Sequence, residues 1–209
     1  MLSRLQFITQ PHPTLSSTQL IEEVCKSGVK MVQLRLKDTT EKEIYRLAKE
    51  AKLVCAKYGA TLILNDYVTI AKDLDLDGVH LGKEDMSPIM ARELLGKDKI
   101  IGGTANNLED ILRLIDAKVN YIGLGPFRYT STKKKLSPIL GVDGYKNIVR
   151  ELAKYSSMAI PPIYAIGGIT VEDVSSILQT GVFGIAVSGA ISNASNLKDS
   201  CSAFLIASR

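Results

Sequence analysis

Two cations and an amide alternate with apolar residues in one short segment of the chain. Gln33, Arg35 and Lys37 occur at steps of two, with an apolar residue in each position between them. Successive side chains of a β-strand point to opposite faces, so the three polar groups would share one face. They are costly to desolvate unless an anion lies among them. A pyrophosphate would suit them, with Arg35 binding in forked geometry and Lys37 as a point charge; the alternative is a structural ion pair with nearby carboxylates.

Two aspartates follow neighbouring predicted strands. Asp66 comes directly after Asn65, at the end of a strand over 61–64, and Asp85 follows a strand over 78–81. Neighbouring strands lie about 5 Å apart, so both carboxylates can reach one cation. Mg²⁺ typically binds one or two carboxylates and takes its other ligands from water and phosphate oxygens. The pair therefore predicts a Mg²⁺ site that bridges protein and pyrophosphate, although either aspartate alone would be typical of a turn or a helix cap.

Small residues follow the last two predicted strands. Gly167 and Gly168 come after a strand over 163–166, and Ser188 and Gly189 come after a strand over 184–187. Barrels of alternating strands and helices often bind phosphate at these positions through backbone N–H groups and a helix N-terminus. We therefore expect a phosphate site here, with tight packing as the alternative for the Gly-Gly turn.

The histidines do not indicate nucleophilic catalysis. The chain has two, His12 and His80, which are too few for a histidine-rich metal site. His80 is expected to be a hydrogen-bonded core residue rather than an acid or base. Because no Ser-His-Asp or Cys-His arrangement can be assembled, the predicted chemistry is stabilisation of charge.

Eight short apolar runs, separated by segments with helical spacing, must position these groups. Over 44–55 the apolar residues recur at steps of three and four, which is typical of a helix that covers a sheet. Repeated β-α units imply parallel strands with right-handed crossovers, and eight units predict a single (β/α)₈ TIM barrel of the α/β class. A doubly wound open sheet shares the local pattern, but the count favours the barrel. The expected strands are 5–8, 31–34, 61–64, 78–81, 99–102, 121–124, 163–166 and 184–187.

One connection is unusually long. The segment over 125–141, GPFRYTSTKKKLSPILG, has no helical period. Connections of this length in compact domains are usually functional or disordered. Its glycines, prolines and lysines suit a flap that closes over anions.

Size and composition indicate one soluble domain over 1–209. The net charge is +4, but the lysines are scattered and no basic run is interleaved with aromatics, so we expect no nucleic-acid partner. No apolar run could span a membrane, and the first residues lack the features of a signal peptide, so we expect a cytoplasmic protein. The three cysteines are interpreted as reduced packing residues. The chain could form a homo-oligomer; the sequence leaves the oligomeric state open.

Five motifs occur in order along nearly the whole chain: QLRLK at 33–37, LND at 64–66, GVHLGKED at 78–85, GPFRYTSTKK at 125–134 and AIGGI at 165–169. Together they resemble the thiamin phosphate synthase family, also called thiamin phosphate pyrophosphorylase. The resemblance implies a TIM-barrel transferase of thiamine biosynthesis, with Mg²⁺ as cofactor and two phosphorylated small molecules as substrates. These are 4-amino-2-methyl-5-(diphosphooxymethyl)pyrimidine and a thiazole phosphate, which the family joins into thiamin phosphate with release of pyrophosphate, by a dissociative substitution.

The resemblance also assigns residues. Asp66 and Asp85 would bind Mg²⁺, and the catalytic cations would be Arg35, Lys37 and Lys133. The residues implied for the pyrimidine diphosphate are Gln33, Arg35, Lys37, Asn65, Thr104 and Lys133. Those implied for the thiazole phosphate are Thr130, Ser131, Thr132, Gly168, Ser188 and Gly189.

The chain departs from the family pattern at three places. After strand 5 it reads GGTANN, where the family usually has a serine followed closely by a histidine; Thr104 keeps a hydroxyl there. Gly189 stands where a serine is usual, one place after Ser188. Arg128 and Tyr129 replace a common Phe-Pro, which would change how the long loop closes.

Two other functions remain open from the sequence. A thiazole tautomerase has a similar barrel without a diphosphate site, but it usually carries a histidine near the start of the long loop, where this chain has Pro126. A catalytically silent phosphate-binding barrel is the other, since a fold alone does not establish activity. The retained aspartates and cations favour the synthase.

Overall fold

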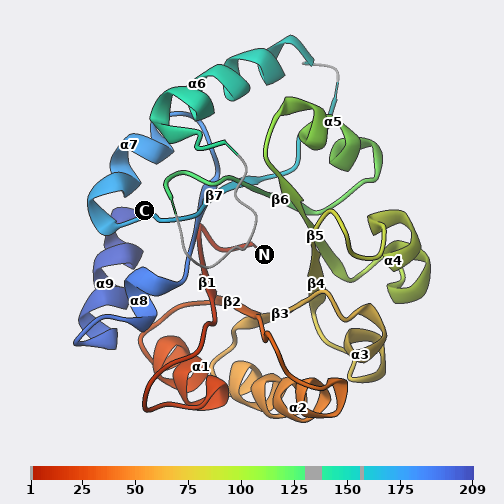
Figure 1. Ribbon diagram of the computed structural model, residues 1–209, viewed down its shortest axis with the longest axis vertical. Helices are drawn as coiled ribbons and strands as arrows, with labels where there is room; N and C mark the ends of the chain where they lie inside the picture. Colours follow the sequence, from red (N-terminus) through yellow and green to blue (C-terminus); the bar gives the residue numbers. More distant parts are fainter. Residues whose placement is uncertain (1, 130–137, 156–157) are drawn as a thin grey trace.

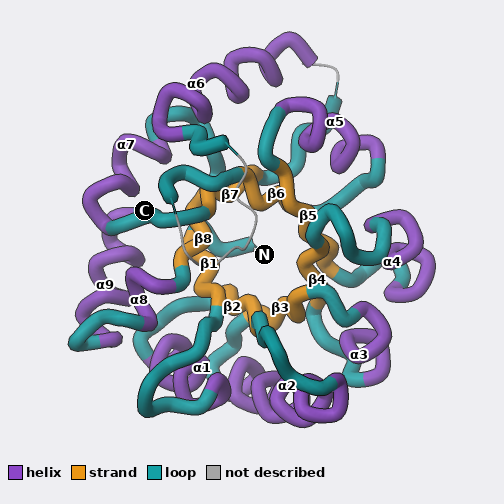
Figure 2. Tube along the Cα trace, viewed as in Figure 1, coloured by secondary structure: helices purple, strands orange, loops and turns teal. Residues whose placement is uncertain are grey.

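Eight parallel strands close into a barrel in sequence order, with β8 pairing back onto β1 (Figure 1). The computed structural model describes residues 2–129, 138–155 and 158–209. Figure 2 shows the strands as an inner ring and the helices as an outer ring around it. The predicted (β/α)₈ TIM barrel is therefore confirmed. The strands are β1 (Leu5–Ile8), β2 (Met31–Leu34), β3 (Thr61–Asn65), β4 (Gly78–Leu81), β5 (Ile100–Ala105), β6 (Tyr121–Leu124), β7 (Ile163–Ile166) and β8 (Gly184–Val187).

Helices follow the strands on the outside of the barrel. None of those in the described ranges is long and apolar enough to cross a membrane. The α-helices are α1 (Ser17–Lys26), α2 (Glu41–Lys57), α3 (Val68–Asp73), α4 (Pro88–Leu95), α5 (Leu108–Asp116), α6 (Gly141–Leu152), α7 (Val174–Leu178), α8 (Gly189–Ser192) and α9 (Leu197–Ala207). Short 3₁₀ turns cover Ala153–Tyr155 and Val171–Asp173.

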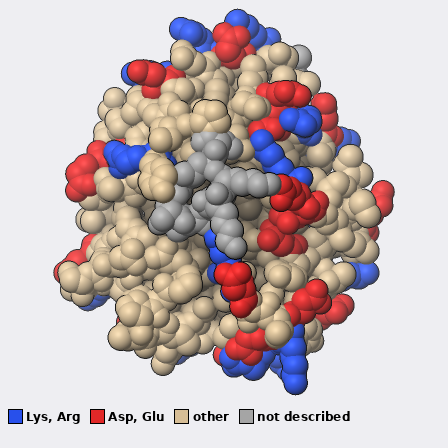
Figure 3. All heavy atoms as spheres, in the orientation of Figure 1, with Lys and Arg blue, Asp and Glu red and all other residues tan. Residues whose placement is uncertain are grey.

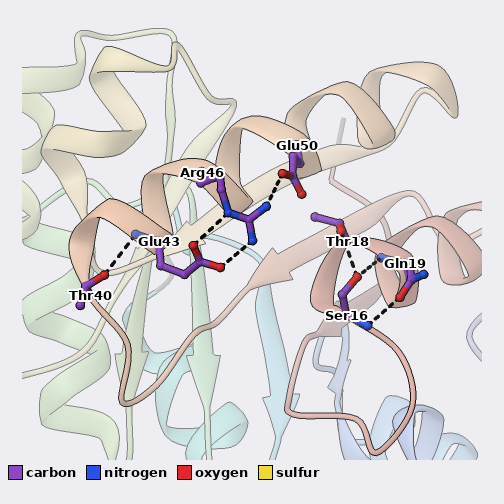
Figure 4. A network of polar contacts seen from close by, with 7 residues as sticks. All are labelled: Ser16, Thr18, Gln19, Thr40, Glu43, Arg46 and Glu50. Atoms are coloured by element: carbon purple, nitrogen blue, oxygen red, sulfur yellow. Dashed lines mark hydrogen bonds and ion pairs between the residues drawn. The ribbon is translucent and has the colours of Figure 1, made fainter.

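Local side-chain contacts fix the first two helices. Ser16 accepts a hydrogen bond from the backbone of Gln19 at 3.2 Å, and the Gln19 side chain accepts one from the Ser16 backbone at 2.9 Å. This reciprocal pair satisfies two N–H groups that the helix leaves without partners. On α2, Arg46 lies between Glu43 and Glu50, one turn away on either side (Figure 4). These exposed ion pairs support the helix modestly.

The barrel has two apolar layers because side chains alternate along each strand. Outward-facing residues such as Val32 and Leu34 pack with the helices, whereas inward-facing ones fill the barrel. The inner cluster contains two tyrosines, Tyr121 and Tyr164, in edge-to-face contact with ring centroids 5.4 Å apart. The Tyr164 hydroxyl donates to the carbonyl of Ser3 at 2.5 Å, so the N-terminal segment crosses one end of the barrel. The opposite, carboxyl end is the one left for a site.

Strand β5 is longer than the predicted 99–102 and contains Thr104. The two glycines read as the end of a strand are instead inside it, because large neighbours fill the space where their side chains would be. A Cβ on Gly102 would lie 2.2 Å from Cζ of Tyr121, and one on Gly103 would lie 2.4 Å from a methyl of Leu114. The segment described as following strand 5 therefore begins within it, and Thr104 is held by the sheet rather than by a loop.

Candidate active site

A cavity of about 480 Å³ lies at the carboxyl ends of the strands. Strand ends and the residues directly after them supply its walls, which is the usual position of active sites in this fold. Figure 3 shows that cationic and anionic side chains are interspersed around the rim of the face in view. Seven of the residues predicted to bind substrates line the cavity: Gln33, Arg35, Asn65, Thr104, Gly168, Ser188 and Gly189.

Arg35 is held by a threonine that sequence reasoning missed. The Arg35 backbone N–H donates to Oγ1 of Thr9 at 2.9 Å, and that hydroxyl donates to the Arg35 carbonyl at 3.2 Å. Burial lowers the pKa of Arg35, while the carboxylates of Asp66 and Asp85 oppose this by favouring the cation. Arg35 is thus a partly desolvated cation that faces two carboxylates.

Gln33 lies deeper in the same wall. Only 2% of it is exposed, and its Nε2 has no hydrogen bond of good geometry to a described residue, although the side chain lies close enough to the Tyr121 hydroxyl to oppose the rise in the pKa of that tyrosine. Buried amide groups are nearly always hydrogen-bonded, so an unpaired one indicates a site for a ligand or water. The shared face predicted for the alternating polar residues therefore applies to Gln33 and Arg35. Lys37 is exposed and is not among the residues that line the cavity, so its place on this face stays a prediction.

Asp66 and Asp85 come together as a carboxyl pair. Asp66 has a left-handed backbone, φ 72°, and its N–H donates to the carbonyl of His80 at 2.9 Å. Asp85 is anchored by the N–H of Gly82, 2.6 Å from Oδ2. Burial raises the pKa of Asp66 to about 7, assisted by a hydrogen bond and charge repulsion from Asp85 and opposed by Arg35. A cation between the two carboxyl groups would remove that repulsion.

This pair fits the ligand set of Mg²⁺. Within the described residues there is no group of three or more His, Cys, Asp and Glu that could hold a metal. Two carboxylates suffice for Mg²⁺ when water and phosphate oxygens complete the octahedron. Asp85 also lines a neighbouring cavity of about 230 Å³, and Thr104 lies at the wall of both cavities.

The residues predicted to bind phosphate lie in the turns after β7 and β8. Gly167 and Gly168 have φ values of 100° and 68°, which favour glycine, and a Cβ on Gly168 would lie 2.8 Å from the carbonyl oxygen of Tyr129. The Ser188 hydroxyl donates to Gln10 at 3.2 Å, and the Gln10 amide donates to Asn193 at 2.9 Å. Gln10 and Asn193 line the cavity but were missed, because uncharged residues near strand ends carry no pattern in the sequence.

Arg128, one of the departures from the family pattern, joins the start of the long loop to the turn after β7. Its guanidinium binds both oxygens of Asp173, at 2.9 and 2.8 Å, and donates to the carbonyl of Gly168 at 2.9 Å. Asp173 also accepts from the backbone N–H and the hydroxyl of Thr170, both at 2.9 Å. The residue after Arg128, Tyr129, lines the cavity.

His80 is a hydrogen-bonded core residue, as expected. It is 6% exposed, and its two ring nitrogens contact the hydroxyls of Tyr121 and Thr104 at 3.0 and 2.9 Å. The three cysteines are likewise buried and free. The predictions for Thr130, Ser131, Thr132 and Lys133 lie outside the described residues.

Comparison with known proteins decides the family. A family model described as thiamine monophosphate synthase matches residues 5–191. The chain belongs to the thiamine monophosphate synthase family. It is 46% identical over 198 residues to a thiamine-phosphate synthase of Flavobacterium johnsoniae, covering 95% of this chain and 92% of the relative. It is 47% identical to one of Bacteroides fragilis, covering 91% and 92%.

A solved structure agrees with this membership. The thiamine phosphate pyrophosphorylase of Pyrococcus furiosus superimposes with a TM-score of 0.85 at 28% identity, covering 98% of this chain and 95% of that one. Members of the thiamine monophosphate synthase family are transferases of thiamine biosynthesis, and the resemblance stated on five motifs is confirmed over nearly the whole chain.

Proposed function

We propose that this chain condenses 4-amino-2-methyl-5-(diphosphooxymethyl)pyrimidine with a thiazole phosphate, giving thiamin phosphate and pyrophosphate by a Mg²⁺-assisted dissociative substitution. The observation that carries the proposal is the convergence of Arg35 with the Asp66–Asp85 pair beside the cavity. A diphosphate together with a divalent cation would pair all three groups. Neither an isolated phosphate nor an apolar ligand would do so.

The diphosphate end would be bound by charge. Asp66 and Asp85 would hold Mg²⁺, which when bound supplies positive charge to the leaving diphosphate. Arg35 would bind its oxygens in forked geometry from a backbone that Thr9 fixes. The exposed Lys37 and the undescribed Lys133 stay predicted contributors. Neutralising the leaving group in a water-poor site is the main requirement when a carbon–oxygen bond breaks before the new bond forms.

The pyrimidine ring would lie against Gln33, Asn65 and Thr104. The unpaired Nε2 of Gln33 would gain a partner from a ring nitrogen, which removes the penalty of its burial. Electron donation from the amino group of the pyrimidine would stabilise positive charge at the reacting carbon. The thiazole nitrogen would then attack that carbon from the other side of the cavity.

The thiazole phosphate would be bound by Gly168, Ser188 and Gly189, which follow β7 and β8, three and two strands around the barrel from β2. Backbone N–H groups can serve there, so replacement of the usual serine by Gly189 does not remove donors. Thr130, Ser131 and Thr132 stay predicted ligands from the sequence.

The test is pyrophosphate release by purified protein given both substrates, with Mg²⁺ or with EDTA, while thiamin phosphate is followed after oxidation to fluorescent thiochrome. We expect release that requires both substrates and the metal and that matches the product formed. Binding of the thiazole phosphate with no turnover would contradict the proposal and favour a tautomerase-like or silent barrel.

A further inference from the structure

A chain of hydrogen bonds crosses the barrel interior and ends at the cavity. Nε2 of Gln6 on β1 donates to the Tyr121 hydroxyl on β6 at 3.1 Å. That hydroxyl lies 3.0 Å from Nδ1 of His80 on β4, and Nε2 of His80 lies 2.9 Å from the Thr104 hydroxyl on β5. The first three residues are at most 6% exposed. His80 and Thr104 both line the cavity, and Thr104 is the last residue of the hydrogen-bond chain.

Glycines on the neighbouring strands leave room for both rings of this chain. A Cβ on Gly102 would overlap the Tyr121 ring at 2.2 Å, and one on Gly123 would lie 3.1 Å from Cε1 of His80. The two rings pack with centroids 5.4 Å apart. Their positions are therefore fixed by the sheet itself.

The hydrogen bonds of this chain run in one direction, which is set at its buried end, Gln6. The Gln6 amide donates to the tyrosine oxygen, and burial raises the pKa of Tyr121, so the phenol keeps its proton and donates it to Nδ1 of His80. A neutral imidazole carries one N–H, which must then be on Nε2. Nε2 donates to the Thr104 oxygen, and the Thr104 proton is left to point elsewhere. Among the described residues that hydroxyl makes no second hydrogen bond.

We propose that Gln6, Tyr121 and His80 act as positioning residues that fix Thr104 as a hydrogen-bond donor toward the cavity, so that the ligand atom it meets is an acceptor. For an aminopyrimidine this atom is a ring nitrogen and not the exocyclic amino group. The inference deepens the proposed function by naming the edge of the pyrimidine that is recognised, and it rests on that function for the identity of the ligand.

The direction of the chain can be measured in the unmodified protein. The protein has two histidines, so ¹⁵N–¹H correlation spectra resolve both imidazoles, and a His12→Gln variant assigns the signals of His80. We expect neutral His80 with its proton on Nε2. A proton on Nδ1 would reverse every donor in the chain and overturn the proposal.

The consequence for binding is tested by removing one hydroxyl at a time. Tyr121→Phe keeps the ring but frees the imidazole tautomer, and we expect about a tenfold loss of affinity for 4-amino-2-methyl-5-hydroxymethylpyrimidine in calorimetry, equivalent to one net hydrogen bond. Thr104→Val should lose as much, and Thr104→Ser should restore it. Tyr164→Phe is the matched control, because its hydroxyl binds Ser3 at the other end of the barrel, and it should leave the affinity unchanged.

A double variant distinguishes a positioning role of Tyr121 from a general loss of structure in the binding site. In a Thr104→Val background, Tyr121→Phe should cost less affinity than it does in the wild type, because the part of its effect that passes through Thr104 is already lost. Additive losses, or unchanged affinity in Thr104→Val, would overturn the proposal. Because this probe carries no diphosphate, a protein that shows the expected tautomer and affinities but releases no pyrophosphate would refute the proposed function and leave this inference standing.

Discussion

Asp66→Asn should stabilise the metal-free protein and abolish its response to Mg²⁺. The folded-state pKa of Asp66 is about 7, against 3.8 for the free residue, because the carboxyl is partly buried beside Asp85. Between these pH values the folded protein binds a proton that the unfolded chain does not, so the stability of the metal-free protein falls as the pH rises toward 7 and above. Asparagine has nearly the same shape, tolerates the positive φ and cannot ionise.

The size of the effect follows from the same pKa. A change from 3.8 to about 7 corresponds to at most about 4 kcal/mol of unfolding free energy. Water and counterions reach this partly exposed pair, so we expect about 1–2 kcal/mol. In EDTA at pH 8, Asp66→Asn should therefore be more stable than the wild type by this amount, and the difference should narrow at pH 5. Mg²⁺ should stabilise the wild type by mass action but not the variant.

Urea unfolding followed by circular dichroism, at both pH values and with Mg²⁺ or EDTA, measures these differences. Asp38→Asn is the matched control: Asp38 also has a positive φ, 52°, but is exposed, and its replacement should change neither stability nor the response to Mg²⁺. If Asp66→Asn were less stable than the wild type in EDTA at pH 8, or if Mg²⁺ stabilised both equally, the metal assignment would be wrong.

Three further predictions concern other parts of the site. Arg128→Ala and Asp173→Asn should each raise KM for the thiazole phosphate about 3- to 10-fold in steady-state kinetics. The double variant should have the same KM as the more affected single variant, because both substitutions break the same ion pair. Additive increases in KM would contradict this. Gly168→Ala should lower the free energy of unfolding by about 1–3 kcal/mol, since it forces a side chain into positive φ against a carbonyl, and an unchanged urea midpoint would refute the strain. Arg35→Lys should reduce kcat/KM for the pyrimidine diphosphate at least about tenfold through loss of forked binding; equal rates would mean that Arg35 contributes only charge.

The fold could be predicted because short apolar runs and helical spacing recur eight times, and local pattern and global topology agree. The sequence pattern was less informative about strand ends, because glycines inside a strand look like the turn after it. Gly102 and Gly103 look like the end of a strand, yet they lie inside β5 because neighbouring side chains fill their space. Arg35 lines the cavity although β2 ends one residue before it, so the alternation of polar residues alone does not give the length of the strand.

Charged site residues stand out in the sequence, whereas several uncharged ones were missed. Arg35 and the two aspartates are conspicuous because ionised groups are rarely placed at strand ends without a partner. Thr9 supports Arg35 through two hydrogen bonds, but a threonine after an apolar strand is also an ordinary β-former. Tyr121 has the same difficulty, because its ring belongs to the core and only its hydroxyl belongs to the polar chain.

The two ends of the cavity are held by different means. On the pyrimidine side, Gln33 and Thr104 belong to strands that are hydrogen-bonded to neighbours on both sides, so their positions depend on the barrel as a whole. On the phosphate side, Gly168 belongs to a turn whose position depends on the contact with Arg128 and on the cap formed by Asp173. A turn held by one ion pair can change its sequence together with its partner, whereas a strand residue is constrained by the strands on both sides. The unusual residues at 128 and 129 therefore lie on the side where such exchange is least constrained.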